Sequence, residues 1–313
     1  MQLRGIDFGD VFAASGSMGF FGEGYWHHRF FWPAGLESLG ITFVSKTATI
    51  APRAGNMPLR RDHTPAERFP ACVKVRPFRG EVVNAVGLSN PGIGALLNTG
   101  RWQTRTAPFL ISVASVASTR EERVGEMRAI NEIIRRRRHE FKGPFGIEIN
   151  VSCPNAGEAT DKEAIIGEVR ELTEALETVG VPLIPKLSVS GAVAARVAGP
   201  LQADPNCDAI CVSNTLPWGW GERRDVSPLS REGFTPGGIS GAMLLPFVTY
   251  WINDLRFVGF KKPVNGGGGI LSREDVWAYR RAGASAVFLG SVTILRPWRV
   301  KGIVAEAKSL DWS

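Results

Sequence analysis

The stretch FGIEINVSCPNAGEATDKEAIIGEVRELTEALETVGVPLIPKLSV (145–189) indicates the fold. It begins with an apolar run, FGIEINVS (145–152), and ends with another, VPLIPKLSV (181–189). Between them, residues 161–179 carry apolar side chains at spacings of three and four, the pattern of an amphipathic helix. The two runs lack strict polar–apolar alternation, as expected for parallel strands buried on both faces. The stretch therefore predicts a strand–helix–strand unit.

The same alternation of apolar runs and helical stretches recurs along the chain. Further runs rich in apolar or β-branched residues indicate strands at residues 11–15, 41–47, 108–115, 207–214, 263–269 and 285–291. Eight strand-then-helix units predict an α/β fold, a (β/α)8 TIM barrel formed as a single domain by residues 1–313. A doubly wound sheet is the alternative, but no GxGxxG pattern follows the first run.

Two of the helical stretches carry signals for their ends. Residues 119–140 begin with Thr119-Arg120-Glu121-Glu122, and residues 272–282 begin with Ser272-Arg273-Glu274-Asp275. Both beginnings match the capping-box pattern. Gly283 follows the second stretch and suits the left-handed residue that ends many helices.

Two segments between predicted strands are too long for simple connections. Residues 48–83 are rich in Pro, Arg and Gly, and residues 215–237 contain Trp218 and Trp220. In a barrel these segments follow strands two and six, so we expect long loops at the C-terminal face, where active sites of such barrels lie. Loops of this length in a compact domain are usually functional.

The composition excludes several classes of protein. The chain of 313 residues is 44% hydrophobic and 21% charged, with a net charge of +7. No apolar run approaches the ~20 residues of a membrane-spanning helix, and the N-terminus has no apolar signal-peptide core. We therefore expect a cytoplasmic protein without a membrane partner. The basic run Arg135–Arg138 lies on an amphipathic helix and is interpreted as a solvated helix end, so no nucleic-acid partner is expected.

The four cysteines do not form a metal-binding pattern. They stand at positions 72, 153, 207 and 211, and no pair has CxxC spacing. Iron–sulfur and zinc-ribbon sites depend on such spacings, so we expect no metal site in this chain.

The segment Asn150-Val151-Ser152-Cys153-Pro154-Asn155 is the sharpest chemical signal. It ends a predicted strand, at the point where the chain leaves the barrel mouth. Its carboxamides can donate and accept hydrogen bonds to a ring that bears amide or imide groups. The Cys153 thiol between them can serve as a nucleophile or a proton-transfer group. The alternative is a turn that uses Asn and Pro for backbone reasons.

Glycine-rich elements at the ends of the last two predicted strands indicate a phosphate site. Gly266–Gly269 precede the Ser272-capped helix, and Gly290-Ser291 end the last strand. Glycines let backbone N–H groups approach a phosphate, and a following helix N-terminus favours the anion. A phosphorylated ligand or cofactor is therefore expected, with purely structural turns as the alternative. Lys46 and Lys186 also fall at strand ends, where they can stabilise a reduced flavin or a substrate carboxylate, or lie on an exposed rim.

Taken together, these residues resemble the dihydroorotate dehydrogenase family over about residues 12–298. The matching elements, in order, are Ala14-Ser15-Gly16, Ser45-Lys46-Thr47, Asn84-Ala85-Val86-Gly87-Leu88-Ser89-Asn90, Glu148-Ile149-Asn150-Val151-Ser152-Cys153-Pro154-Asn155, Pro185-Lys186-Leu187-Ser188, Ser213-Asn214-Thr215, Gly237-Gly238-Ile239-Ser240-Gly241, Gly266-Gly267-Gly268-Gly269-Ile270 and Gly290-Ser291.

The resemblance implies an FMN-containing barrel that oxidises dihydroorotate to orotate in pyrimidine biosynthesis. It implies cofactor contacts by Ala14, Ser15, Gly16, Lys46, Thr47, Asn150, Lys186, Ser213, Ser240, Gly241, Gly268, Gly269, Gly290 and Ser291. It implies substrate contacts by Lys46, Asn84, Gly87, Leu88, Asn155, Asn214 and Thr215. Cys153 takes the position of the catalytic base, with Lys46 beside both flavin and substrate. A cysteine there is typical of the soluble class, since the membrane-associated class has serine.

Several alternatives stay open at this point. Segments 63–80 and 216–236 depart from the family's usual sequence, so the substrate could be another dihydropyrimidine, as in dihydropyrimidine dehydrogenase. A tRNA dihydrouridine synthase-like enzyme and a non-catalytic flavin-binding subunit are further alternatives. We expect a homodimer, with an electron-transfer partner subunit as an option. The sequence leaves the electron acceptor open among fumarate, a quinone and NAD reached through a partner.

Overall fold

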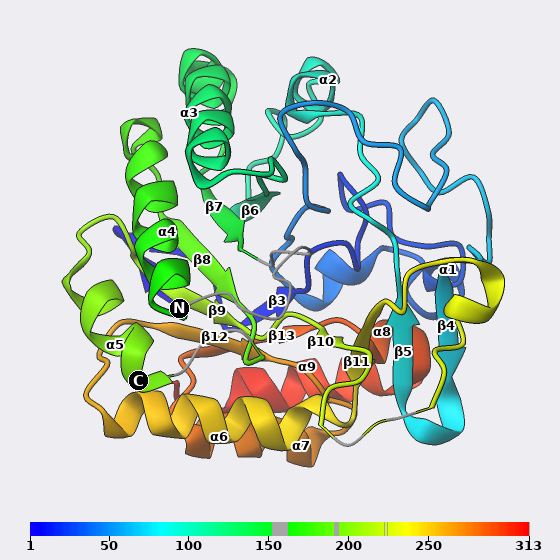
Figure 1. Cartoon of the computed structure of the whole chain (residues 1–313). Helices are drawn as coiled ribbons and strands as arrows, with labels where there is room; N and C mark the ends of the chain where they lie inside the picture. Colours follow the sequence, from blue (N-terminus) through cyan, green and yellow to red (C-terminus); the bar gives the residue numbers. More distant parts are fainter. Residues whose placement is uncertain (152–161, 191–193, 222, 224, 313) are drawn as a thin grey trace.

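The computed structural model describes residues 1–313 except 152–161, 191–193, 222, 224 and 313 (Figure 1). Seven parallel strands form a curled sheet in the order β3-β13-β12-β9-β8-β7-β6. Their bounds are β3 (Val11–Ala13), β6 (Phe109–Val113), β7 (Phe145–Asn150), β8 (Leu183–Leu187), β9 (Ile210–Val212), β12 (Val264–Gly267) and β13 (Ala286–Leu289). These strands lie inside seven of the eight predicted runs, so the predicted α/β barrel architecture is confirmed.

The prediction of a continuous second strand over residues 41–47 is wrong. Residues 42–48 instead make isolated parallel bridges, from Thr42 to Phe12 of β3 and from Val44 to Leu110 of β6. The ladder is interrupted because the Lys46 N–H donates to the Gly19 carbonyl (2.8 Å) rather than to a neighbouring strand. The segment still bonds to both β3 and β6, and it thereby closes the sheet into a barrel.

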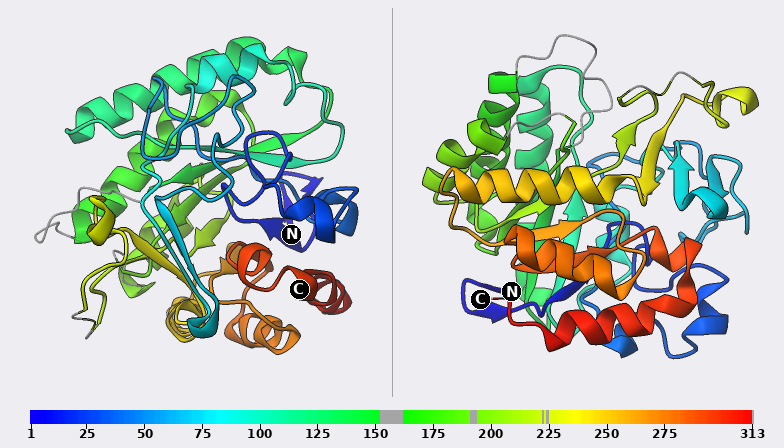
Figure 2. Two further views of the ribbon diagram at one scale, coloured as in Figure 1. Left: turned by 90° about the vertical axis from the view of Figure 1, so that its right-hand side faces the viewer. Right: turned by 90° about the horizontal axis from the view of Figure 1, so that it is seen from below.

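The helices lie on the outer side of the curled sheet (Figure 1 and Figure 2). The α-helices are α1 (His28–Phe31), α2 (Ile93–Asn98), α3 (Arg120–Arg137), α4 (Lys162–Ala175), α5 (Ala194–Ala203), α6 (Leu244–Phe257), α7 (Arg273–Ala282), α8 (Val292–Leu295) and α9 (Val300–Ser309). The short 3-10 helices are η1 (Leu36–Leu39), η2 (Pro77–Arg79), η3 (Arg138–Glu140), η4 (Glu177–Val179), η5 (Ser230–Glu232) and η6 (Pro297–Arg299). Within the described ranges, no helix is long and apolar enough to cross a membrane.

Local signals set the ends of two of these helices. Thr119 and Glu122 form the predicted capping box of α3, and Ser272 and Asp275 form that of α7. Gly283 ends α7 with φ of 91°, in the left-handed region. The basic end of α3 is stabilised by ion pairs on its own helix surface, for example Arg136 to Glu132. This arrangement agrees with a solvated helix end.

The two long segments, with the residues that directly follow them, come together as a second sheet. Strands β4 (Val73–Arg76), β5 (Glu81–Asn84), β10 (Leu216–Pro217) and β11 (Gly238–Gly241) pair antiparallel in the order β10-β11-β5-β4. This small sheet lies beyond the carboxyl ends of the barrel strands (Figure 1). A two-stranded hairpin, β1 (Gln2–Leu3) and β2 (Ile6–Asp7), packs Leu3 into the apolar interior of the barrel.

The barrel interior changes character along its length. Alternate strand residues point inward, and the lower inward positions are apolar, for example Leu110 of β6 and Ile184 of β8. Two residues farther along each strand, the inward positions carry Ser112 and Lys186. The outward positions, such as Ile111, pack against the helices. Polar groups therefore gather at the carboxyl ends of the strands.

Candidate active site

A chain of hydrogen bonds joins four strand ends at the mouth of the barrel. The Ser15 and Thr47 hydroxyls lie 2.9 Å apart, and Thr47 lies 2.9 Å from the Ser112 hydroxyl. The Asn150 amide donates to Thr47 (3.2 Å), and the Asn214 amide donates to the Asn150 carbonyl oxygen (2.8 Å). Successive hydrogen bonds thus connect three predicted cofactor residues, Ser15, Thr47 and Asn150, to the predicted substrate residue Asn214.

Lys186 lies on β8, the strand next to Asn150 of β7, and is only 5% exposed. Its ammonium lies 3.7 Å from a Glu148 carboxylate oxygen and 5.1 Å from the centre of the Phe288 ring. Burial by itself lowers the pKa of Lys186, but Glu148 and Cys211 outweigh it and leave the pKa above the ordinary lysine value. The Glu148 carboxylate therefore favours the charged form of this buried lysine.

Lys46 supplies a second cation from the irregular segment between β3 and β6. Its ammonium donates to the Ser89 carbonyl (2.5 Å) and lies 5.0 Å from the centre of the Phe20 ring. Gly87 and Leu88 both have positive φ, 68° and 56°, in the turn that leads to Ser89. Burial lowers the pKa of Lys46 to about 8, although the Glu23 carboxylate acts in the opposite direction. An anionic ligand beside Lys46 would compensate this cost.

The low pKa of Lys46 predicts a pH-dependent stability of the ligand-free protein. Between the folded value of about 8 and the unfolded value of about 10.4, the unfolded chain binds more protons at Lys46. Stability conferred through this group therefore rises with pH across that window. At about pH 7, Lys46→Met should melt at a higher temperature than wild type, because methionine has no charge to desolvate. The difference should shrink towards about pH 10 in a thermal melting series; a difference that stays constant with pH would contradict the prediction.

The predicted glycine elements meet at the ends of β12 and β13. A Cβ at Gly241 would lie 2.0 Å from the Gly80 carbonyl, and one at Gly269 would lie 2.7 Å from the Leu245 nitrogen. A Cβ at Gly290 would lie 2.9 Å from that of Ala14, which places the predicted N-terminal cofactor element beside the last strand. Among the described residues, no backbone hydrogen bond outside helices and strands is donated by the amides of Gly269 or Ser291. These amides are suited to bind an anion.

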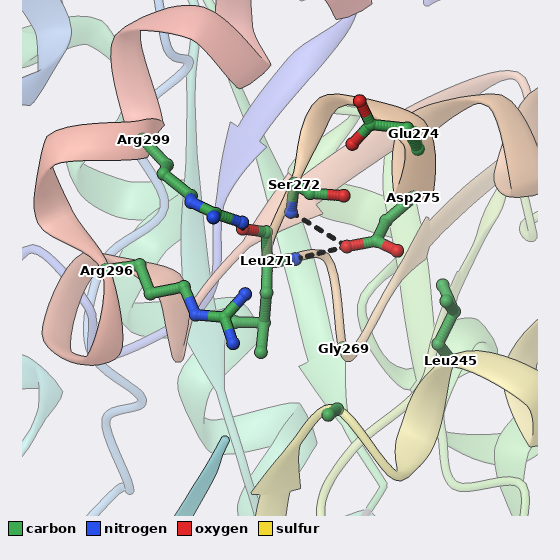
Figure 3. A pocket seen from close by; sticks show the side chains of 9 residues that line it. Leu245, Gly269, Leu271, Ser272, Glu274, Asp275, Arg296 and Arg299 are labelled. Atoms are coloured by element: carbon green, nitrogen blue, oxygen red, sulfur yellow. Dashed lines mark hydrogen bonds between the residues drawn. The ribbon is translucent and has the colours of Figure 1, made fainter. Parts of the chain in front are cut away.

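An open pocket of about 350 Å³ borders Gly269 (Figure 3). It is lined by Ala242, Leu245, Gly269, Leu271, Ser272, Glu274, Asp275, Arg296 and Arg299. The Asp275 carboxylate accepts from the amides of Leu271 and Ser272, each at 2.8 Å, so these amides of the α7 cap already have an acceptor. Arg296, which the sequence analysis did not single out, lines the same pocket and adds a cation near Gly269.

The predicted substrate residues are divided between the barrel and the small sheet. Asn84 ends β5 opposite Gly238 of β11. Thr215 fills the space beside Gly238, because a Cβ there would lie 2.2 Å from the Thr215 hydroxyl oxygen. Cys153 and Asn155 lie outside the described residues. The hydroxyls of two predicted cofactor residues bond to the backbone: Ser213 donates to the Asn214 carbonyl and Ser240 to that of Val82.

Sequence reasoning missed several residues that hold the site together. The Tyr25 hydroxyl donates to the Gly16 carbonyl (2.7 Å) and so fixes the predicted cofactor turn, which has φ of 86° at Gly16. Ser112 and Glu148 connect the hydrogen-bond chain to Lys186. The available signal was a polar residue within an otherwise apolar strand, as in PFLISVAS and FGIEINVS.

Comparison with known proteins agrees with this architecture. A family model described as dihydroorotate dehydrogenase matches residues 2–310. The chain is 31% identical, over 95% of its length and 86% of the relative's, to the dihydroorotate dehydrogenase B (NAD(+)) catalytic subunit of Desulforudis audaxviator. The protein of the same name from Geobacillus sp. (strain WCH70) is 31% identical over 98% of this chain and 88% of its own. This chain therefore belongs to the dihydroorotate dehydrogenase family of oxidoreductases.

Proposed function

We propose that this chain oxidises dihydroorotate to orotate as the FMN-binding catalytic subunit of a two-subunit enzyme. The observation that carries the proposal is the hydrogen-bond chain through Ser15, Thr47, Asn150 and Asn214, with Lys186 beside it. It joins cofactor and substrate positions at one barrel mouth. The names of the relatives, catalytic subunits of an NAD(+)-linked dihydroorotate dehydrogenase, support the same reading.

The residues present fit a flavin mononucleotide. The glycines Gly241, Gly269 and Gly290 leave no room for side chains, and the amides of Gly269 and Ser291 can bind its phosphate. We propose that the predicted cofactor residues around its ring are Ala14, Ser15, Gly16, Thr47, Asn150 and Lys186. The remaining ones, among them Ser213, Ser240 and Gly268, would lie along its ribityl phosphate. When bound, the flavin would supply the hydride acceptor of the reaction.

The chain's own residues would bind the substrate and move one proton. Lys46 can pair with the substrate carboxylate, because its desolvated ammonium lacks full compensation in the ligand-free site. Asn84, Asn155 and Asn214, with Thr215 and the turn at Gly87 and Leu88, would hydrogen-bond the ring amides. Cys153 would remove the proton from the ring carbon next to the one that loses hydride.

We also propose the surroundings of this subunit. Residues 1–313 would form one FMN-binding domain, and two copies would associate as a homodimer in the cytoplasm. The sequence contains no GxGxxG nicotinamide fingerprint and no CxxC pair, so the electrons would leave through a partner subunit that reaches NAD. Purification with and without such a partner, followed by NAD reduction assays, tests this part.

An anaerobic flavin-bleaching assay tests the reaction itself. The purified protein would be loaded with FMN and mixed with dihydroorotate, dihydrouracil or dihydrothymine in the absence of oxygen. We expect bleaching with dihydroorotate and none, or far slower bleaching, with the two rings that lack a carboxylate. Faster bleaching by dihydrouracil would assign the chain to dihydropyrimidine oxidation. Protein that binds FMN but bleaches with no ring would indicate a non-catalytic subunit.

The asparagine at the end of the hydrogen-bond chain offers a test of substrate binding. Asn214→Ala removes the donor to Asn150. It also removes the hydrogen bond that Asn214 is proposed to make to a ring amide of the ligand. A buried polar group left without its partner costs ~1–3 kcal/mol, so orotate affinity should fall by about fivefold or more. Exposed Asn253 of α6 provides the matched control, since Asn253→Ala makes the same change away from the mouth. Equal orotate affinity of Asn214→Ala and the control, measured by titration calorimetry, would contradict the assignment.

A further inference from the structure

Glu148 is a charged group in the barrel interior to which the proposed reaction gives no role. It lies on β7, is only 2% exposed, and stands opposite Ser112 of β6 in the strand register. Its neighbours on the same strand, Ile147 and Ile149, point outward into the apolar layer beneath the helices. Glu148 itself therefore points to the barrel axis, one layer below Asn150.

The carboxylate of Glu148 connects two parts of the site. Its Oε1 accepts from the Ser112 hydroxyl (3.0 Å), which belongs to the hydrogen-bond chain, and lies 3.7 Å from the Lys186 ammonium. The titratable groups that face Lys186 are Glu148 from β7 and Cys211 from β9, and the Phe288 ring of β13 packs on it. Glu148 is thus the counter-ion of Lys186 among the described residues.

A buried lysine needs such a counter-ion to remain charged. Desolvation disfavours the ammonium form, and an adjacent carboxylate restores it. Breaking a buried ion pair by removing one partner leaves the other charge uncompensated, which is strongly destabilising. Without the carboxylate, Lys186 would lose its proton most readily when no other negative charge is near.

We propose that Glu148 is a positioning residue for the oxidoreductase reaction: it keeps the Lys186 ammonium charged and in place before any electrons arrive. The proposal rests on the proposed flavin function, because Lys186 is taken to face the flavin ring. Glu148 would act only through Lys186, without contact to substrate or cofactor. Its removal should therefore alter the proton balance of the site more than its shape.

The number of protons taken up when the flavin is reduced provides a test, because this number would not change if Glu148 had only a structural role. Two electrons and one proton convert an oxidised flavin to its anionic reduced form. In wild type, Lys186 is charged both before and after, so one proton is taken up. In Glu148→Gln, Lys186 would be neutral before reduction and would take up a second proton when negative charge forms beside it. The slope of the flavin midpoint potential against pH should therefore double.

The experiment uses the FMN-loaded protein and measures midpoint potentials by dye-linked reductive titration at several pH values from about 7.5 to 9, below the ordinary lysine pKa of ~10.4. Glu148→Gln should show twice the wild-type slope, and Glu148→Asp should restore the wild-type slope. Asp204→Asn is the matched control. Asp204 directly follows α5 and is a buried carboxylate that accepts a hydrogen bond from the Thr173 hydroxyl of α4. This variant should keep the wild-type slope. A wild-type slope in flavin-loaded Glu148→Gln would overturn the proposal.

This outcome is separable from failure of the proposed function. Wild-type protein that neither contains nor binds FMN would refute the flavin function, whereas an unchanged slope in a flavin-loaded variant refutes only the role of Glu148. Should Glu148→Gln fold too poorly to load, thermal melting without flavin decides between the outcomes. The Glu148→Gln, Lys186→Met double variant should then melt above the Glu148→Gln single variant, because methionine, unlike a buried lysine without a counter-ion, has no proton to give up on folding. A double variant that melts no higher than the Glu148→Gln single variant would overturn the proposal.

Discussion

Flavin reduction by dihydroorotate is expected to slow by about 100-fold or more in Cys153→Ala, the usual contribution of a positioned base. The thiol has an ordinary pKa of ~8.5, so only a minority is thiolate at neutral pH. The wild-type rate should therefore rise with pH and level off above the pKa of the thiol. Stopped-flow absorbance of the flavin under anaerobic conditions measures this half-reaction directly.

Two further variants separate base chemistry from packing at this position. Cys153→Ser should retain some activity only at higher pH, because a hydroxyl gives up its proton less readily than a thiol. FMN content should survive both changes, since the thiol has no assigned contact with the cofactor. If Cys153→Ala reduced the flavin at a near-normal rate at every pH, Cys153 would be a packing residue, and the base would lie elsewhere in the barrel mouth.

The second large effect is expected at the proposed phosphate site beside Gly269. A Cβ at Gly269 would lie 2.7 Å from the Leu245 nitrogen, and Gly269 has φ of 79°. Gly269→Ala should therefore displace the backbone whose amide is proposed to bind the phosphate. A hydrogen bond to a charged group contributes ~1.5–3 kcal/mol, so FMN affinity should fall by about tenfold to a hundredfold.

A second glycine separates phosphate binding from backbone strain. Gly259 also has positive φ, 94°, but a Cβ there would meet nothing within 4 Å. Gly259 follows the end of α6, whereas Leu245, the neighbour of Gly269, lies at the start of that helix. Gly259→Ala therefore introduces the same kind of conformational strain away from the proposed phosphate site. Fluorescence titration of the flavin-free proteins should show weakened FMN binding in Gly269→Ala alone. Comparable affinities in the two variants would move the phosphate site away from Gly269.

The irregular second strand shows where local pattern stops predicting structure. The run ITFVSKT (41–47) has the composition of a strand, and residues 42–48 do occupy the expected place between β3 and β6. The ladder breaks at Lys46, whose N–H bonds to Gly19, a residue 27 positions earlier. No pattern within the run itself encodes that contact, because its partner comes from another part of the chain.

The amino-acid sequence by itself determined the elements governed by short-range rules. Strand positions follow from apolar runs, the α3 and α7 starts from capping boxes, and the Gly283 helix end from the need for positive φ. The ordered set of glycine and asparagine elements was enough to indicate the family, because each element meets a local backbone or hydrogen-bonding requirement.

Only the tertiary structure decided how distant polar groups meet. It paired the strands at residues 73–84 with those at residues 216–241 into one small sheet, joined Tyr25 to Gly16, and placed Glu148 beside Lys186. Each of these contacts depends on barrel closure, which sets which strands are neighbours and which residues share a layer. A polar residue in an apolar run can be noticed in the sequence, but its partner is fixed by strand register, and register is a property of the assembled sheet.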